Sequence, residues 1–270
     1  MATFTSVLCA LDSSALASRV LRHAVGVAGA FGARLTVLTV TDGDPKPAEA
    51  RLTTLLHTVI PPGATYAGEP TVQAARRILG SAADAILTEA RGGFDLIVIG
   101  THSQGGLRRW LLGSTSRMLL EEARCPVLLV PPGELDIVTL GPDAVSLHPG
   151  VVMAAVDPSE HNRRQLSFAG RFAALARQPL LLMTVAPAAT SDQAAERVLR
   201  ELAEEAAAGP VDRVIVRRGA VSAQIDAAAA DAHAGLVVMG LQERGPGVPG
   251  EIATALLEAK DAVVLAVPAI

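Results

Sequence analysis

The most informative stretch of this chain is residues 96–116, LIVIGTHSQGGLRRWLLGSTS. It opens with the apolar run Leu96–Gly100, which is typical of a buried parallel strand. It ends with Gly113–Ser116 at the beginning of an apolar segment of helical period. Because ligands bind outside the carboxyl ends of strands in an open parallel sheet, we expect the intervening loop to lie at a binding crevice.

Short apolar runs alternate with Ala-rich segments on both sides of this stretch, which predicts βαβ units and a parallel sheet. The predicted strands of the first half are Val7–Leu11, Arg34–Val40, Thr65–Gly68, Leu96–Gly100 and Val127–Val130. The predicted helices are Ala15–Phe31, Pro47–Ile60, Thr71–Arg91 and Ser114–Ala123. In the first helix, apolar residues from Val20 to Ala28 recur at helical spacing, so this stripe should face the sheet.

The second half repeats the same order of elements. Val151–Val156 ends at Asp157 as Val7–Leu11 ends at Asp12, and Leu236–Gly240 corresponds to Leu96–Gly100. Likewise, Leu180–Val185 matches Arg34–Val40, and Val263–Pro268 matches Val127–Pro131. We therefore predict an α/β fold with two tandem, doubly wound, five-stranded parallel-sheet domains, 1–140 and 141–270. The proline-rich segment Pro131–Pro149 between them is predicted to be a linker.

Composition excludes several classes of protein. The chain has 23 Lys and Arg against 27 Asp and Glu, a net charge of -4, so no overall positive field would attract nucleic acid. No apolar run reaches the ~20 residues that span a bilayer. The segment Met1–Leu11 lacks a basic region and is followed at once by Asp12, unlike a signal peptide. We expect a cytoplasmic protein that binds neither nucleic acid nor membrane.

The usual enzyme templates are also missing. The two lysines, Lys46 and Lys260, do not follow a glycine, so a phosphate loop of the GxxxxGK type cannot form. The histidines are scattered, and no metalloprotease, serine-hydrolase or calcium-loop motif occurs. Cys9 and Cys125 lie in or beside apolar runs without CxxC spacing, which predicts core thiols.

The beginning of the helix at Gly113 is the candidate anion site. Unpaired backbone N–H groups and the helix dipole favour a negative group there, and the hydroxyls of Ser114, Thr115 and Ser116 add donors. The alternative is that Ser114 simply caps its helix. Arg109, in the preceding loop, is a further candidate phosphate contact, with a solvated arginine as the alternative.

These residues resemble the universal stress protein family. Its nucleotide-binding motif is glycine, two residues, glycine, nine residues, glycine, then serine or threonine, and Gly100, Ser103, Gly113 and Ser114 occupy those positions. The resemblance implies a Rossmann-like fold of the adenine nucleotide alpha hydrolase type, with strand order 3-2-1-4-5. It also implies ATP, with or without Mg²⁺, as the ligand.

The resemblance assigns further contacts to the ends of the first two strands. Ala10, Leu11 and Asp12 are expected beside the ribose or adenine, and the backbone of Val40 beside the adenine edge. One departure is Ser103, which stands where the motif has its second glycine. Its Cβ would crowd the phosphates if φ had to be positive, although its hydroxyl could replace lost contacts.

The second copy departs further from the motif. Glu243 stands where the motif requires a glycine, and Glu251 replaces the hydroxyl after Gly250. Both carboxylates would repel phosphate, so no triphosphate is expected in the second half.

Three functions remain open. The first is ATP binding in the N-terminal domain with the C-terminal domain as scaffold, and with slow hydrolysis at most because no catalytic set accompanies the loop. The second is an interaction or dimerisation scaffold that binds no nucleotide. The third, an adenylyl-transferring enzyme, needs catalytic residues that the sequence does not offer. The apolar last strands of the two copies are expected to pair, making the chain a pseudo-dimer that could dimerise again.

Overall fold

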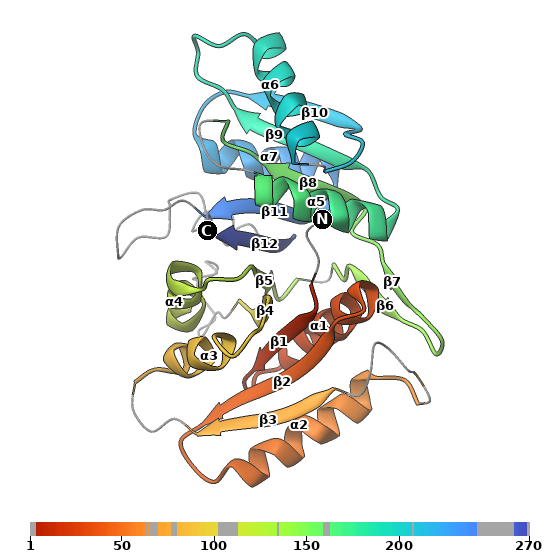
Figure 1. Ribbon diagram of the computed structural model, residues 1–270, viewed down its shortest axis with the longest axis vertical. Helices are drawn as coiled ribbons and strands as arrows, with labels where there is room; N and C mark the ends of the chain where they lie inside the picture. Colours follow the sequence, from red (N-terminus) through yellow and green to blue (C-terminus); the bar gives the residue numbers. More distant parts are fainter. Residues whose placement is uncertain are drawn as a thin grey trace.

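The computed structural model describes residues 4–62, 64, 70–76, 80–101, 113–133, 135–158, 163–206, 208–241 and 262–268. Its centre is a ten-stranded sheet with the order β10-β9-β8-β11-β12-β5-β4-β1-β2-β3 (Figure 1). The first half of the chain supplies β1 to β5 and the second half β8 to β12. Within each half the order is 3-2-1-4-5, so the predicted α/β architecture and strand order are confirmed.

The elements of the first half follow one another as strand and helix. They are β1 (Ser6–Leu11), α1 (Ala17–Phe31), β2 (Arg34–Thr41), α2 (Pro45–Val59), β3 (Thr71–Arg76), α3 (Ala82–Ala90), β4 (Leu96–Gly100), α4 (Ser114–Glu122) and β5 (Val127–Val130). All neighbouring strands in this half pair in parallel.

The second half has the same succession. Its elements are β8 (Val151–Ala155), α5 (Arg163–Ala176), β9 (Leu180–Val185), α6 (Asp192–Glu205), β10 (Arg213–Arg217), α7 (Val221–Ala232), β11 (Ala234–Leu241) and β12 (Val263–Pro268). Here too the neighbouring strands are parallel.

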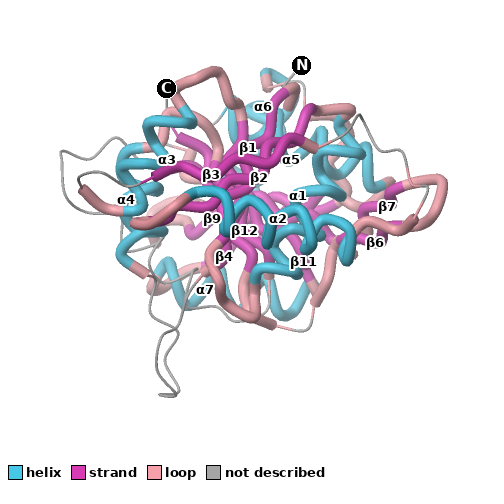
Figure 2. The backbone as a smooth tube through the Cα atoms, turned by 90° about the horizontal axis from the view of Figure 1, so that it is seen from below, coloured by secondary structure: helices cyan, strands magenta, loops and turns pink. Residues whose placement is uncertain are grey.

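Helices cover both faces of the sheet (Figure 2). One buried apolar cluster joins α1, α2, α5 and α6 to one face, and a second joins α3, α4 and α7 to the other. The predicted stripe from Val20 to Ala28 on α1 is buried, because these residues recur on the side of the helix that meets the sheet. Cys9 and Cys125 are buried free thiols, as predicted, and burial raises the pKa of Cys125 to about 11.

The two halves meet at an antiparallel strand pair. β5 and β12 lie in register through Leu129 and Val264, Leu128 and Leu265, and Val127 and Ala266. Each strand therefore supplies the backbone hydrogen-bonding partners that the edge of the other strand would otherwise lack.

An aromatic cluster also crosses this boundary. Phe4, before β1, stacks on Phe168 of α5 with ring centroids 4.7 Å apart and ring planes 11° apart. Phe31 of α1 meets Phe172 of α5 edge to face at 5.0 Å. Four buried or half-buried rings thus pack elements of the first half against one helix of the second.

One predicted helix was wrong over much of its length. Thr71–Arg91 was expected to be helical, but Thr71–Arg76 forms β3 and the helix begins only at Ala82. β3 pairs with the open edge of β2 from Thr36 to Thr41, a tertiary contact that overrides local helix propensity. The proposed strand Thr65–Gly68 lies outside the described residues.

The helix start had a readable signal. Ser81 caps α3 by accepting a hydrogen bond from the backbone of Asp84, whose carboxylate in turn accepts one from the Ser81 backbone. This capping box places the beginning of the helix at Ala82.

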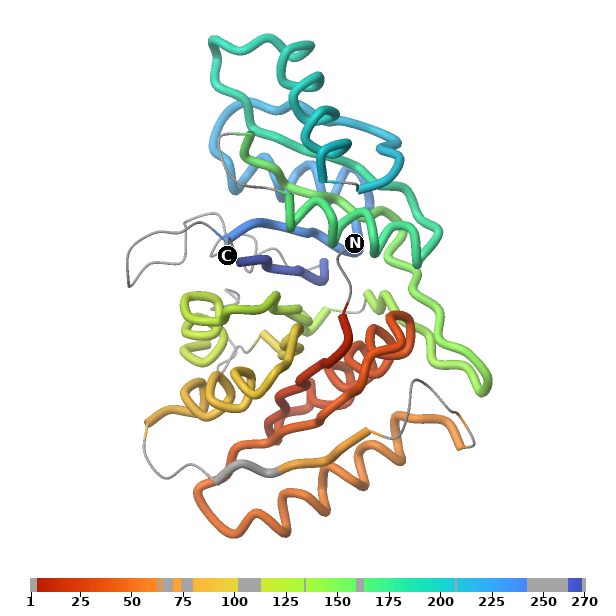
Figure 3. The backbone as a smooth tube through the Cα atoms, viewed as in Figure 1, coloured from red at the N-terminus to blue at the C-terminus, as the bar shows by residue number. Residues whose placement is uncertain are grey.

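The connection between the halves is not an irregular linker. It contains a β-hairpin formed by β6 (Val138–Leu140) and β7 (Val145–Leu147), which lies along α1 (Figure 3). Gly26 of α1 makes room for this contact, because a Cβ there would overlap the side chain of Val138. The domain boundary predicted at residue 140 falls inside the hairpin, at the end of β6.

Charged and polar contacts hold the beginning of the hairpin on α1. Asp136 forms an ion pair with Arg19 at 2.9 Å and accepts a hydrogen bond from Arg22 at 2.8 Å, and Arg19 also donates to the carbonyl of Leu135. His23 is fully buried between them. Its Nδ1 donates to the Arg19 carbonyl at 2.9 Å and its Nε2 accepts from Ile137 N–H at 3.5 Å, so the ring is neutral.

Protonation of His23 is expected to weaken the fold. Burial lowers the pKa of His23 to about 4, against 6.5 when unfolded, so the unfolded chain binds the extra proton first. Stability is therefore complete above about pH 6.5 and falls toward pH 4, by about 3 kcal/mol in total for this group. Urea unfolding between pH 7 and 4 measures the loss.

The variant His23→Gln is the control for this prediction, because glutamine does not titrate. The difference in unfolding free energy between the original chain and this variant should shrink as the pH falls. Equal pH slopes for the two proteins would contradict the assignment of the loss to His23.

Candidate functional site

A cavity of about 540 Å³ opens at the carboxyl ends of β1 and β4. These strands are neighbours, but β1 continues into α1 on one face of the sheet and β4 leads to α4 on the other. The cavity thus lies at the point where successive connections leave in opposite directions, as the sequence predicted for Asp12 and Gly100.

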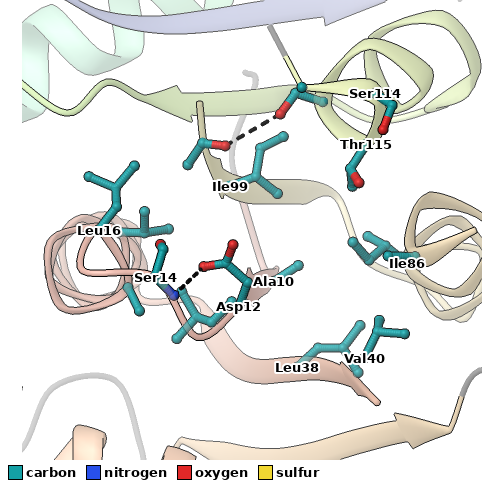
Figure 4. Close-up of a pocket in the computed structure, with 17 residues that line it drawn as sticks. Ala10, Asp12, Ser14, Leu16, Leu38, Val40, Ile86, Ile99, Ser114 and Thr115 are labelled. Carbon is teal, nitrogen blue, oxygen red and sulfur yellow. Dashed lines mark hydrogen bonds between the residues drawn. The ribbon is translucent and has the colours of Figure 1, made fainter. Parts of the chain in front are cut away.

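The inner wall of the cavity is apolar. It is lined by side chains from β2, β4, α1 and α3: Leu38, Val40, Ile99, Leu16, Ala17, Val20, Ala82 and Ile86 (Figure 4). Val40 was predicted from the end of the second strand. The contributions of α1 and α3 were not predicted, because they depend on how these helices pack and not on a local motif.

Asp12 occupies the polar mouth of the cavity. Its side chain is exposed, and Oδ1 accepts a hydrogen bond from the backbone N–H of Ser14 at 3.0 Å (Figure 4). This turn directs the carboxylate at the end of β1, beside the lining residues Ala10 and Leu11. Ser14 also lines the cavity and was not among the predicted site residues.

The beginning of α4 forms the opposite side of the mouth. Gly113 is the N-cap residue, with φ -61° and ψ 155°, and as a glycine it has no side chain to cap the helix. The first N–H groups of α4 therefore receive no cap from Gly113, and the exposed Ser114 and half-buried Thr115 add hydroxyls. The backbone at Gly113 has a conformation that any residue can adopt.

Ser116 has a different role from the expected ligand contact. Its side chain is only 3% exposed, and its hydroxyl donates to the carbonyl of Gly100 at 3.3 Å. The bond ties α4 to the end of β4 and so joins the two ends of the loop. Ser116 lines the cavity, but its hydroxyl proton is already engaged.

Gly100 is explained by helix packing. A Cβ at this position would lie 2.7 Å from Cδ2 of Leu16 and 3.0 Å from Cγ2 of Val20, so glycine lets α1 approach the end of β4. Of the predicted site residues, Ser103 and Arg109 lie outside the described part of the chain, in residues 102–112.

Comparison with known proteins agrees with this geometry. The sequence profile of the universal stress protein family matches residues 3–131. A Thermus aquaticus protein named "Universal stress protein in QAH/OAS sulfhydrylase 3'region" is 37% identical over 136 residues, covering 47% of this chain and 98% of the relative. The chain belongs to the universal stress protein family.

Solved structures extend the similarity of this universal stress protein over both halves. A Pseudomonas aeruginosa UCBPP-PA14 protein described as a universal stress protein has a TM-score of 0.75 and 22% identity, over 98% of this chain and 93% of its own. The universal stress protein from Archaeoglobus fulgidus DSM 4304 has a TM-score of 0.70 and 19% identity, over 98% of both chains. These structures show that both halves share the fold.

Among the described residues of this universal stress protein, no helix combines the length and hydrophobicity needed to cross a membrane. The same residues contain no cluster of three or more His, Cys, Asp or Glu side chains suited to a metal ion.

Proposed function

We propose that this chain binds ATP, or a related adenine nucleotide, in the cavity of its first half. The observation that carries the proposal is the division of this cavity into an apolar interior and a polar mouth at a helix N-terminus whose N-cap residue is a glycine. Its volume of about 540 Å³ lies within the range of ~300 to 1,000 Å³ typical of small-molecule sites.

The beginning of α4 would hold the phosphates. Its first N–H groups and the hydroxyls of Ser114 and Thr115 are donors, and hydrogen bonds to a charged group contribute ~1.5 to 3 kcal/mol each. Several such bonds can retain a polyphosphate without lysine. Ser103 and Arg109 are proposed to add contacts from the loop, and Mg²⁺ would enter with the phosphates, held mainly by their oxygens and water.

The nucleoside would occupy the inner part of the cavity. Leu38, Val40 and Ile86 offer apolar surface to the base, and the backbone of Val40 offers polar groups to its edge. Asp12, at the mouth, would accept hydrogen bonds from the ribose hydroxyls. The base and phosphates would then point to opposite ends of the same cavity.

The proposed activity is binding and not rapid turnover. Among the described lining residues, Asp12 is the only one with a titratable side chain, so the wall supplies no pair of acid and base. A regulatory role in which nucleotide occupancy is read by other proteins fits such a site.

We also propose that the two halves are domains that act as a pseudo-dimer, with the second as scaffold. The antiparallel pairing of β5 with β12 and the stacking of Phe4 on Phe168 support this arrangement. The boundary between the two proposed domains, near residue 140, would then lie within the β6–β7 hairpin.

Isothermal titration calorimetry with ATP tests the proposal on protein freed of bound nucleotide. We expect saturable binding with one ATP per chain, and adenosine should bind more weakly because it lacks the phosphates. Mass spectrometry of small molecules released from freshly purified protein identifies the natural nucleotide. No heat of binding at millimolar ATP would refute the proposal and favour the nucleotide-free scaffold.

A further inference from the structure

The second half repeats the switch in connections at which the cavity of the first half opens, and this place is called its crevice below. It lies where β8 and β11, the central strands of that half, approach their carboxyl ends beneath α5 (Figure 1). Backbone N–H of Val156 donates to the carbonyl of Met183 of β9 at 2.8 Å, so the pairing of β8 with β9 continues one residue beyond Ala155.

The side chain of Gln165 fills the space between these two strands. It comes from the first turn of α5 and is only 2% exposed. Its Nε2 donates to the carbonyl of Ala155 on β8 at 2.6 Å and to that of Val238 on β11 at 3.0 Å. Since an amide nitrogen carries two hydrogens, both are used in bridging the strands.

The buried side chain of Gln165 is held by the two hydrogen bonds that Nε2 donates and not by its Oε1. This buried oxygen accepts no hydrogen bond from the part of the chain that the structure describes. An acceptor without a partner disfavours burial of the side chain. The two hydrogen bonds from Nε2 to the strand carbonyls offset this cost. The orientation of the amide is fixed, because exchanging the oxygen and nitrogen would bring oxygen against two carbonyls.

Valine occupies the equivalent place in the first half. Val20 follows Asp12 at the same spacing at which Gln165 follows Asp157, and both side chains are 2% exposed. Val20 lines the nucleotide cavity and can make no such bridge. The two crevices therefore differ in whether the residue from the covering helix can join the central strands.

We propose that Gln165 closes the crevice of the second half and restricts the chain to one nucleotide site. This inference rests on the proposed function, which supplies the ligand. It attributes the lack of nucleotide binding in the second half to Gln165 as well as to the carboxylates of Glu243 and Glu251. The bridge itself is a property of the chain without ligand.

The first experiment measures the bridge without nucleotide. Gln165→Met keeps the length of the side chain but removes both donors. Hydrogen exchange followed by mass spectrometry should be at least tenfold faster for amides in residues 151–156 and 236–241, while 6–11 and 96–100 stay unchanged. Unchanged exchange in the second half would overturn the proposal.

The second experiment transfers the bridge to the first half. Val20→Gln places an amide at the position equivalent to Gln165, whereas Val20→Met adds similar bulk without donors. Calorimetry with ATP should give a Kd for Val20→Gln at least tenfold above that of Val20→Met. Equal Kd values, or two ATP molecules bound per original chain, would overturn the proposal. If the original chain binds no ATP, the proposed function fails, and hydrogen exchange still decides whether the bridge exists.

Discussion

Replacing Gly113 by aspartate is expected to abolish ATP binding while leaving the fold intact. The new carboxylate would lie at the N-terminus of α4, where the phosphates are proposed to bind, and like charges about 4 Å apart repel by about 3 to 4 kcal/mol at a protein surface. This corresponds to at least about a hundredfold increase in the Kd measured by calorimetry. The backbone at Gly113, with φ -61° and ψ 155°, is one that aspartate adopts readily as an N-cap.

Gly113→Asn is the matched control for charge. Asparagine has nearly the shape of aspartate and caps helices equally well, so the two variants should unfold at similar temperatures. We expect Gly113→Asn to weaken ATP binding much less than Gly113→Asp. If both bind ATP as the original chain does, the phosphates do not lie at α4.

Phe4→Ala is expected to have the largest effect on stability. The ring of Phe4 is fully buried and contacts Phe31, Phe168 and Phe172, with centroid distances of 4.8, 4.7 and 6.1 Å. Removing it leaves a cavity between the halves, which costs about 3 to 5 kcal/mol. For a chain of this size the midpoint of thermal unfolding should fall by about 10 °C.

Phe4→Leu separates apolar volume from ring stacking. Leucine fills most of the space, so this variant should lose only about 1 to 2 kcal/mol in urea unfolding. A loss below 1 kcal/mol for Phe4→Ala would show that the aromatic cluster does not hold the halves together.

The positions of the central strands could be read from the sequence because each is a short apolar run with a recognisable end, whereas their order was implied by the resemblance to the universal stress protein family. Asp12 and Gly100 marked the ends of β1 and β4, and these residues do lie at one cavity. β3 was missed because it is an edge strand whose pairing with β2 is set by tertiary structure. The residues from Thr71 to Arg76 do not by themselves predict that contact.

The same limit applies to the linker and the cavity walls. Prolines and glycines correctly marked a change of structure after Pro131, but the docking of Val138 against Gly26 joins residues far apart in the chain. Ile86 and Val20 looked like ordinary core residues of helices, and only packing shows that they line a cavity. Ser116 was chosen for its hydroxyl, which the structure uses to hold Gly100.

The antiparallel contact between β5 and β12 gives the molecule two unlike rims. All the remaining neighbouring pairs in the sheet are parallel, so the strands of the second half run opposite to those of the first. The mouth beside Asp12 and the crevice at Gln165 consequently face away from each other. A protein that recognises the rim with the proposed nucleotide site would meet it once per chain, whereas a symmetric pair of identical single domains would display it twice.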